Sequence, residues 1–194
     1  KGSYLLNLSR GKVVDVEAVR SALLNNHLAG CSFDVYPEEP KKNTNDFVSV
    51  LQNCPNTILT PHIGGATEEA QHSIGIDVTS KIIHYLTFGD TFETVNFPKI
   101  QVHTGERHKI YIKNIHKNHS GVMSKINNIF EKLNINITKQ YVDTHKDIGY
   151  CITVFDFKSN LYKISLINTT FLDGLLESIN QLDTTIHTSL YIDN

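Results

Sequence analysis

The stretch Thr57-Ile58-Leu59-Thr60-Pro61-His62-Ile63-Gly64-Gly65 carries the strongest structural signal in this sequence. Its first four residues form a short apolar run that predicts a buried strand. His62 follows that run, and the two glycines after it let backbone approach a ligand closely. We therefore expect a strand over 57–60 whose carboxyl end presents an imidazole at the edge of a sheet.

Upstream of this stretch the pattern is strand, helix, strand, loop, strand. Short apolar runs predict strands over 4–8 and 28–35, and a loop rich in Pro and Asn covers 36–56. Asp15 is a candidate N-cap for a helix that runs to about residue 26, with an apolar face of Val16, Val19, Leu23 and Leu24. This order predicts a parallel α/β sheet, where ligands bind beyond the carboxyl ends of the strands.

A long helix is predicted from Thr67 to the neighbourhood of Phe88 and Gly89. Glu68 and Glu69 suit the dipole of its first turn. An apolar stripe at near-fourfold spacing runs along it: Ala70, Ile74, Val78, Ile82 and Tyr85. Residues 90–106 are expected to link this helix to a last domain.

From residue 108 the pattern changes to strand, helix, strand, strand, helix, strand. Strands are expected over 109–115, 135–137, 150–157 and 185–192, with a turn around 146–149. Amphipathic helices are expected over 122–133 and 172–182. This split order is ferredoxin-like. Residues 158–170 are interpreted as a surface insertion.

The composition is that of an ordinary globular protein. The 194 residues are 40% hydrophobic and 20% charged, with a formal net charge of −2. This charge gives no electrostatic case for nucleic acid or an anionic membrane, and no transmembrane or signal-like segment is apparent. Cys31, Cys54 and Cys151 are few, odd in number and widely spaced. They predict reduced thiols in a cytoplasmic protein, and neither disulfides nor a metal site.

Three groups suit hydride transfer at an α-keto acid. His62 can exchange a proton near neutral pH, and Arg10 can hold a substrate carboxylate in a bidentate fork. A carboxylate from Asp34-Val35-Tyr36-Pro37-Glu38-Glu39-Pro40 can orient the imidazole and favour its charged form. Spacing alone does not separate Glu38 from Glu39. Each group also has an ordinary alternative, as a surface charge or a core histidine.

The three motifs together, Asn7-x-Ser9-Arg10-Gly11, Asp34-Val35-x-x-x-Glu39-Pro40 and residues 60–65, resemble the C-terminal half of a D-2-hydroxyacid dehydrogenase. The likeness is greatest to members of that family that carry a regulatory ACT domain. It implies an α/β fold with three parts. Residues 1–64 would be the C-terminal part of a Rossmann-like NAD-binding domain. Residues 65–106 would be a crossover helix, return to the substrate domain and linker, and 107–194 a ferredoxin-like (βαββαβ) ACT domain.

The resemblance implies NAD-dependent oxidation of 3-phospho-D-glycerate to 3-phosphohydroxypyruvate, the first step of L-serine biosynthesis. It assigns proton transfer to His62, the partner carboxylate to Glu39 and substrate binding to Arg10, with no metal. Leu8, Ser9 and Arg10 would border the nicotinamide, and Asp34 would bind its carboxamide. The other residues expected to contact the cofactor are His62, Ile63, Gly64 and Gly65.

The resemblance also implies a second site, for L-serine as a feedback inhibitor. His116 and Asn118 lie in a loop that leads into a helix, where free N–H groups attract a carboxylate. With Asn136 of a second subunit they would bind serine, which implies a homo-oligomer and, by resemblance, a homotetramer. Ser120 departs from the family, which usually has Pro before the following Gly. Plain capping of the helix is the alternative role for these residues.

Two other functions remain open. One is a dehydrogenase of another D-2-hydroxy acid, such as 2-hydroxyglutarate, and the other is an amino-acid-binding ACT module without catalysis. The sequence starts at Lys1 and contains no Gly-x-Gly-x-x-Gly phosphate turn. We therefore expect a fragment that begins partway through the dinucleotide-binding domain and is inactive alone. The choice of NAD over NADP depends on an acidic residue outside this stretch.

Overall fold

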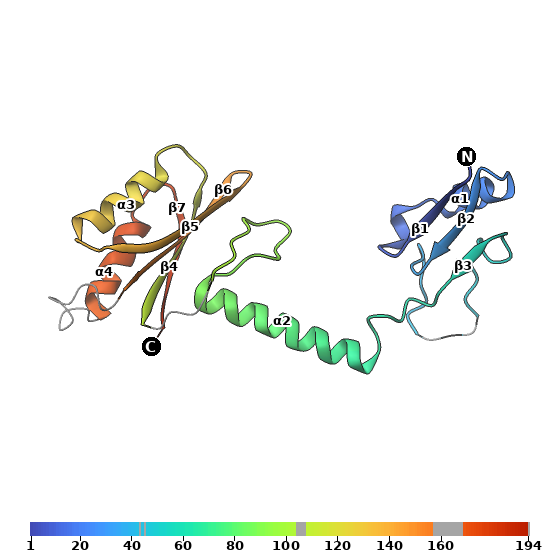
Figure 1. Ribbon diagram of the computed structural model, residues 1–194, viewed down its shortest axis with the longest axis horizontal. Coiled ribbons are helices and arrows are strands. Elements are labelled where there is room, and N and C mark those ends of the chain that lie inside the picture. Colours follow the sequence, from blue (N-terminus) through green and yellow to red (C-terminus); the bar gives the residue numbers. More distant parts are fainter. Residues whose placement is uncertain (43, 45, 104–107, 157–168, 194) are drawn as a thin grey trace. The chain divides into compact units, whose positions relative to one another are not determined.

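A computed structural model of the chain describes residues 1–42, 44, 46–103, 108–156 and 169–193. These residues form two compact units, Lys1–Ile74 and Gly75–Asn194, whose elements are labelled in Figure 1. The expected surface insertion covers 158–170, and its residues 158–168 lie outside the described residues. In the described part of the chain no helix is both long and apolar enough to cross a membrane.

The first unit is built on a parallel sheet, as the sequence predicts. Its strands are β1 (Ser3–Asn7), β2 (Leu28–Phe33) and β3 (Thr57–Leu59), in the order β1-β2-β3. A short 3-10 helix (Gly11–Val13) and α1 (Val16–Leu24) connect the first two strands. The predicted N-cap is confirmed, because the Asp15 carboxylate accepts hydrogen bonds from the backbone N–H groups of Glu17 and Ala18.

The core of this unit lies between α1, the sheet and the loop after β2. Val19 and Leu23 of α1 pack with a buried set from the strands and the loop: Cys31, Phe33, Tyr36 and Leu51. The prediction for Leu24 is wrong, since its side chain is 53% exposed. Leu24 is one residue, about 100° of helix rotation, past Leu23, and so it leaves the narrow buried face of a nine-residue helix.

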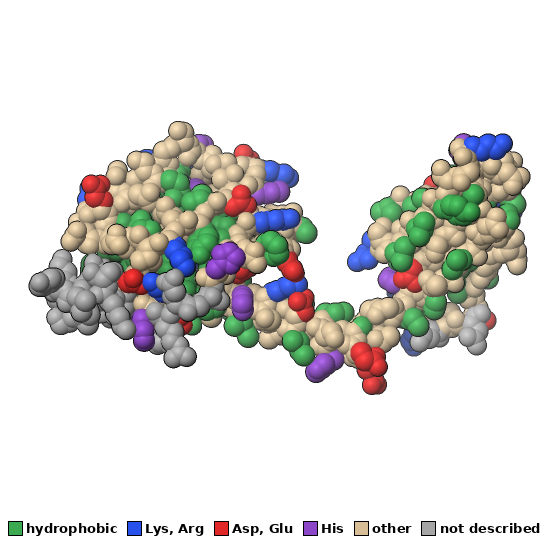
Figure 2. Space-filling model, in the orientation of Figure 1, with side chains coloured by type: hydrophobic (Ala, Val, Ile, Leu, Met, Phe, Trp, Pro, Cys, Tyr) green, Lys and Arg blue, Asp and Glu red, His purple; other side chains and the backbone are tan. Residues whose placement is uncertain are grey.

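Helix α2 (Glu68–Phe88) forms as predicted, but its apolar stripe is not buried. Ile74, Val78, Ile82 and Tyr85 are each between 42% and 53% exposed. Figure 2 shows apolar side chains on the surface of this helix. Among the described residues, nothing buries the stripe.

The second unit contains an antiparallel ferredoxin-like sheet, which confirms the predicted βαββαβ order. Its elements are β4 (Lys109–Lys117), α3 (Val122–Lys132), β5 (Ile137–His145), β6 (Ile148–Asp156), α4 (Thr169–Asn180) and β7 (Thr185–Ile192). The strand order is β5-β6-β4-β7. The prediction of a strand over 135–137 is wrong in extent, because β5 begins at Ile137 and runs on to His145. It is an edge strand of half-buried and exposed residues, many of them polar, so an apolar pattern does not reveal it.

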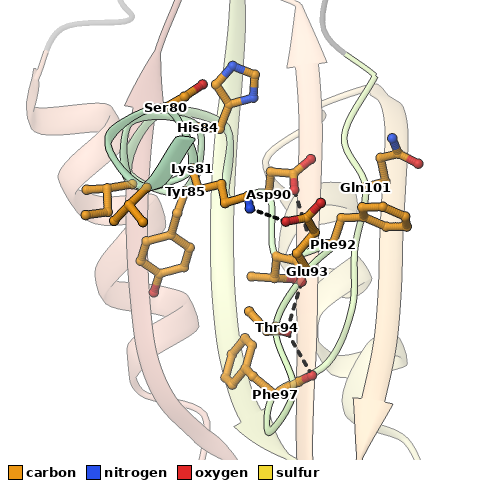
Figure 3. A pocket seen from close by; sticks show the side chains of 13 residues that line it. Ser80, Lys81, His84, Tyr85, Asp90, Phe92, Glu93, Thr94, Phe97 and Gln101 are labelled. Atoms are coloured by element: carbon orange, nitrogen blue, oxygen red, sulfur yellow. Dashed lines mark hydrogen bonds and ion pairs between the residues drawn. The ribbon is translucent and has the colours of Figure 1, made fainter. Parts of the chain in front are cut away.

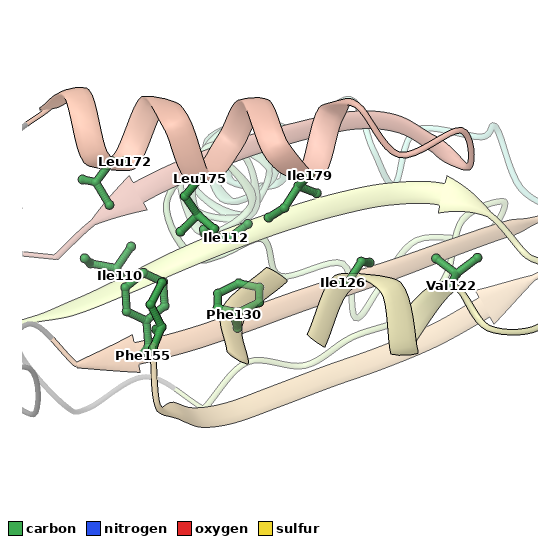
Figure 4. Packing of buried hydrophobic residues seen from close by; sticks show 10 residues of the cluster. Ile110, Ile112, Val122, Ile126, Phe130, Phe155, Leu172, Leu175 and Ile179 are labelled. Atoms are coloured by element: carbon green, nitrogen blue, oxygen red, sulfur yellow. The ribbon is translucent and has the colours of Figure 1, made fainter. Parts of the chain in front are cut away.

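Both faces of this sheet are covered. Helices α3 and α4 pack on one face, where Ile110 and Phe155 meet Phe130 and Leu175 (Figure 4). On the other face Tyr111 and Tyr150 pack against residues from 88–102, among them Ile100 and Val102.

The C-terminal end of α2 is fixed to this second face. The Lys113 ammonium donates to the carbonyl of Leu86 at 2.5 Å, and the Tyr150 hydroxyl donates to the carbonyl of Gly89 at 2.9 Å. Gly89 has φ +84 and no room for a Cβ. The segment after α2 is therefore packed on the antiparallel sheet.

Candidate functional site

The three sequence motifs meet at one edge of the parallel sheet. Because β1, β2 and β3 run in the same direction, their carboxyl ends lie together. Ser9 and Arg10 follow β1, Asp34 follows β2, and His62 follows β3. The backbone ties these ends to one another: Asp34 N–H donates to the carbonyl of Asn7, and Thr60 N–H donates to that of Phe33.

His62 and Glu39 form a hydrogen-bonded pair at this edge. The imidazole Nδ1 lies 2.9 Å from Oε2 and 3.0 Å from Oε1 of the carboxylate. The side chains are 38% and 35% exposed, so a ligand can reach them. His62 has φ +51, a left-handed conformation that is costly for a residue with a side chain. Glu39, and not Glu38, is the carboxylate that contacts the imidazole.

Tyr36 orients both members of this pair, and sequence reasoning missed it. Its backbone N–H donates to Glu39 Oε1 at 2.9 Å, and its hydroxyl lies 2.9 Å from the carbonyl oxygen of Thr60. The N–H of Tyr36 and then the bond to His62 lower the pKa of Glu39, so the carboxylate is held in its charged form. The available signal was an aromatic residue, Tyr36, between the two acidic positions Asp34 and Glu39.

Asp34 fixes the backbone of His62. Its Oδ1 accepts from the hydroxyl of Thr60 at 2.5 Å and from the backbone N–H of His62 at 3.2 Å. This is the loop N–H partner that a carboxylate at the end of a buried strand requires. The side chain thus holds the turn that carries the imidazole.

Arg10 is placed by the turn after β1. Asn7, 4% exposed, donates to the carbonyl of Arg10 and accepts from Ser9. The guanidinium is exposed and donates to the carbonyl of Ser9 at 2.7 Å. Within the described part of the chain it makes no hydrogen bond or ion pair with His62 or Glu39. It is therefore free to bind a ligand.

The remaining residues expected to contact a cofactor are exposed at the same edge. Leu8 is 67% exposed and Ile63 is 51% exposed, which is unusual for side chains of this size. Ser9, Gly64 and Gly65 are exposed too. A Cβ added at Gly64 or Gly65 would meet nothing within 4 Å, so the backbone there is open to a ligand.

The second predicted site lies at one end of the antiparallel sheet. His116, near the end of β4, is 3% exposed, and its ring packs on Gly149 of the neighbouring strand, where a Cβ would lie 2.2 Å from Nε2. Asn118 binds the β5–β6 hairpin: its backbone N–H donates to Asp147 and its side chain to the carbonyl of Lys146. Gly121 precedes α3, and no side chain caps this helix. Plain capping is therefore not the role of Asn118.

Asn136 lies at the opposite end of the sheet from His116. The ladder pairs His116 with Gly149, whereas Ile137 pairs with Phe155. These β6 partners are six residues apart, which is about 20 Å along a strand. His116 and Asn136 of one chain therefore cannot bind the same small molecule.

A cavity of about 600 Å³ lies between α2 and the loop that follows it (Figure 3). Val78, Ile82 and Tyr85 of the apolar stripe line one side of it. Lys81 reaches across its rim to form ion pairs with Asp77 and Glu93. None of the residues with predicted chemistry lines this cavity.

Two of the three cysteines, Cys31 and Cys151, are buried. All three are free thiols, and burial raises the pKa of Cys31 and raises that of Cys151 to about 11. Among the described residues, no group of three or more His, Cys, Asp or Glu side chains could hold a metal ion.

Known proteins match both units. The sequence profile of the D-isomer specific 2-hydroxyacid dehydrogenase NAD binding domain matches residues 1–64, and that of the AHAS small subunit-like ACT domain matches residues 112–166. The D-3-phosphoglycerate dehydrogenase of Dictyostelium discoideum is 48% identical over 161 residues, which are 82% of this chain and 39% of that protein.

Two further relatives bear the same name. The enzyme of Escherichia coli K12 is 44% identical over 78% of this chain and 36% of its own length. D-3-phosphoglycerate dehydrogenase 2 of Saccharomyces cerevisiae is 37% identical over 93% of this chain and 38% of its own length. The chain thus spans about two fifths of the length of the curated relatives it matches.

Proposed function

Residues 1–64 belong to the NAD-binding domain of the D-isomer specific 2-hydroxyacid dehydrogenases, and on that premise we propose that the protein oxidises 3-phospho-D-glycerate to 3-phosphohydroxypyruvate with NAD. The observation that carries this proposal is the His62–Glu39 pair at the carboxyl ends of the parallel strands. It is the acid–base couple that removal of a hydroxyl proton requires.

His62 acts as the general base in this proposal. Because Nδ1 is held by Glu39, Nε2 is the nitrogen left to accept the substrate's hydroxyl proton. The carboxylate stabilises the imidazolium that forms, and the lowered pKa of Glu39 keeps it charged while it does so. Arg10 pairs with the substrate carboxylate and orients the hydroxyl towards His62.

The residues at this edge fit a nicotinamide. Leu8 and Ile63 offer exposed apolar surface for the ring, and Gly64 and Gly65 let backbone approach. Asp34 is proposed to bind the carboxamide. NAD, when bound, supplies the hydride acceptor. The proposed cofactor-binding set is Leu8, Ser9, Arg10, Asp34, His62, Ile63, Gly64 and Gly65.

Steady-state kinetics on the full-length protein test the catalytic proposal. His62→Asn should lower turnover roughly 10²–10⁴-fold, the range for a general acid–base. His27→Asn, a change at an exposed histidine of the same unit, is the matched control and should keep the wild-type rate. A near-wild-type rate for His62→Asn removes the residue from the mechanism. Assaying 2-hydroxyglutarate beside 3-phosphoglycerate tests the alternative substrate.

The 194-residue chain by itself should be inactive. It contains no Gly-x-Gly-x-x-Gly turn for the pyrophosphate, which supplies much of the binding of a dinucleotide. Fluorescence titration should show poor NADH binding. Micromolar affinity would contradict this expectation, and an ACT module without catalysis would be favoured if the longer protein were inactive as well.

The ACT unit is proposed to bind L-serine as a feedback inhibitor. His116 and Asn118 of one subunit would meet Asn136 of another, which the separation of these residues along one sheet supports. The site then needs at least a dimer, and a homotetramer is proposed by resemblance to the relatives. Three free thiols suit a cytoplasmic location.

Substitution at Asn118 tests this regulation. Asn118→Ala should weaken both serine inhibition and calorimetric serine binding while the uninhibited rate is unchanged. Asn128→Ala, on the exposed side of α3, is the control. If Asn118→Ala alters neither quantity, the ACT unit is structural and the feedback proposal fails.

A further inference from the structure

Four polar side chains, three of them buried, form a network beneath the proposed serine site. Asn114 and His116 of β4 are 2% and 3% exposed, and Thr188 of β7 is 6% exposed. Thr185, at the start of β7, completes the set. Its hydroxyl lies 2.8 Å from the carbonyl of Ile179, near the end of α4. Buried polar groups are costly unless each one is hydrogen-bonded, so the donors and acceptors here can be assigned.

The assignment starts at Thr185. Its single hydroxyl hydrogen is donated to the Ile179 carbonyl, so towards Asn114 it can only accept. The amide nitrogen of Asn114 accordingly donates to Thr185 at 3.2 Å and to Thr188 at 3.0 Å. That orientation turns the amide oxygen towards His116, where Oδ1 lies 2.9 Å from Nδ1. Only an Nδ1 that carries its hydrogen can make this bond.

We propose that Asn114 is a positioning residue that holds His116 in the Nδ1–H form, so that the neutral ring offers Nε2 as a hydrogen-bond acceptor for the ammonium group of the amino-acid ligand. The inference rests on the proposed serine site. It specifies which residues bind the ammonium group of the amino acid and which bind its carboxylate. The free N–H groups at the start of α3 are left for the carboxylate, because no side chain caps that helix.

Two features of the site support this division. Burial lowers the pKa of His116, and the bond to Asn114 opposes that shift only in part, so the ring is neutral near neutral pH. Gly149 leaves no space between its backbone and the imidazole, which holds the plane of the ring. The tautomer and the orientation of His116 are thus set before a ligand arrives.

Other ionisable groups lie on the elements around the ring. They are Lys117 on its own strand, His145, Lys146 and Asp147 at the β5–β6 hairpin, and Asp183 and His187 beside or on β7. A pH titration of ligand binding must therefore be compared with a direct measurement on His116.

The direct measurement is the tautomer of His116 in the unliganded wild-type chain. Long-range ¹⁵N–¹H correlation spectra of the histidine-labelled protein distinguish Nδ1–H from Nε2–H, and loss of a signal in His116→Gln assigns it among the ten histidines. We expect a neutral Nδ1–H ring at pH 7. A charged ring or an Nε2–H ring at that pH overturns the inference, whether or not serine binds.

Substitutions distinguish a role of Asn114 in positioning His116 from a purely structural role. Asn114→Ala should mix the two tautomers and weaken serine binding about tenfold, the effect of one hydrogen bond. Asn114→Asp keeps an acceptor for Nδ1–H, but its carboxylate should favour the doubly protonated ring and so raise the pKa of His116. Thr188→Val removes one amide partner and should give an intermediate result. Asn128→Ala should change nothing. If Asn114→Ala fails to fold, Thr188→Val and the wild-type spectrum still decide the question.

The pH profile of serine affinity gives the second readout. If Nε2 accepts from the ammonium, calorimetric affinity should fall as the pH is lowered through the pKa of His116, because a proton then occupies Nε2. Affinity that rises on acidification would mean that a protonated ring binds the carboxylate, and would overturn the inference. If the wild-type protein binds no serine, the proposed feedback regulation fails. The measured tautomer of His116 then still tests whether Asn114 positions the ring.

Discussion

The α-carbon of Gly11 lies directly against the backbone of Tyr36. A Cβ at residue 11 would sit 1.9 Å from the carbonyl carbon of Tyr36 and 2.4 Å from the nitrogen of Pro37. This contact joins the turn that carries Arg10 to the loop that carries Glu39. The absence of a side chain at residue 11 therefore determines how closely the proposed substrate-binding cation approaches the proposed acid–base pair.

Gly11→Ala should separate these two loops. The added carbon meets backbone on both sides and has no flexible neighbour to displace, so we expect a loss of about 1–3 kcal/mol in the free energy of unfolding. Denaturant unfolding of the chain measures it. Gly64→Ala is the matched control, because a Cβ there meets nothing within 4 Å. An unchanged midpoint for Gly11→Ala would show that the loops move apart without cost.

Glu39→Gln should alter the dependence of stability on pH. The pKa of Glu39 is lowered in the folded protein, first by the N–H of Tyr36 and then by His62. A carboxyl with a lowered pKa contributes stability above its unfolded pKa and loses it as pH falls through its folded pKa. Wild type should therefore be more stable than the variant at pH 7, and the difference should shrink as the pH falls below the ordinary glutamate value and through the lowered pKa of Glu39. Glu38→Gln should show no such difference at any pH.

The sequence predicts most of the parallel unit because its signals are local. Asp15 caps the helix that follows it, and the strand before His62 ends where the apolar run ends. The choice between Glu38 and Glu39 could not be made in this way, since the spacings of the two carboxylates to His62 differ by only one residue. It depends on the conformation of the loop, in which the N–H of Tyr36 and the imidazole converge on Glu39.

Residues that act across the ACT unit were not predictable from local patterns. Asn114 has its amide partners 71 and 74 positions later in the chain, and neither threonine has a spacing that points back to it. The expected helix stripe shows the converse case. Its apolar residues do recur at helical spacing. That spacing alone could not predict that Ile74 and Ile82 are exposed in the described part of the chain.

Lys113→Met should change how stability depends on alkaline pH. Lys113 is 8% exposed, burial lowers its pKa, and it donates to the Leu86 carbonyl in the last turn of α2. The unfolded chain therefore binds this proton more tightly, so wild-type stability should rise between the lowered pKa and the ordinary value near 10.5.

The lysine variant should lack that rise, and amide exchange at the end of α2 should be faster because a helix C-terminus loses its cation. Lys132→Met, at an exposed position in the last turn of α3, is the control. Equal pH profiles for wild type and Lys113→Met would mean that the ammonium stays hydrated and does not stabilise α2.

Thr184→Val should stabilise the ACT unit, whereas Thr185→Val should destabilise it. Thr184 is 7% exposed, and its hydroxyl oxygen is buried without a hydrogen-bond partner among the described residues. Such a group costs about 1–3 kcal/mol, and valine has the same shape without the polar atom. Its backbone carbonyl still accepts from Lys117, so the ladder is kept. We expect the free energy of unfolding to rise by about 1 kcal/mol.

Thr185→Val instead removes a donor to Ile179 and an acceptor for Asn114, and should lower the free energy of unfolding by about as much. Thermal melts of the two variants beside wild type should therefore shift in opposite directions. A lower midpoint for Thr184→Val would mean that its hydroxyl binds an ordered water.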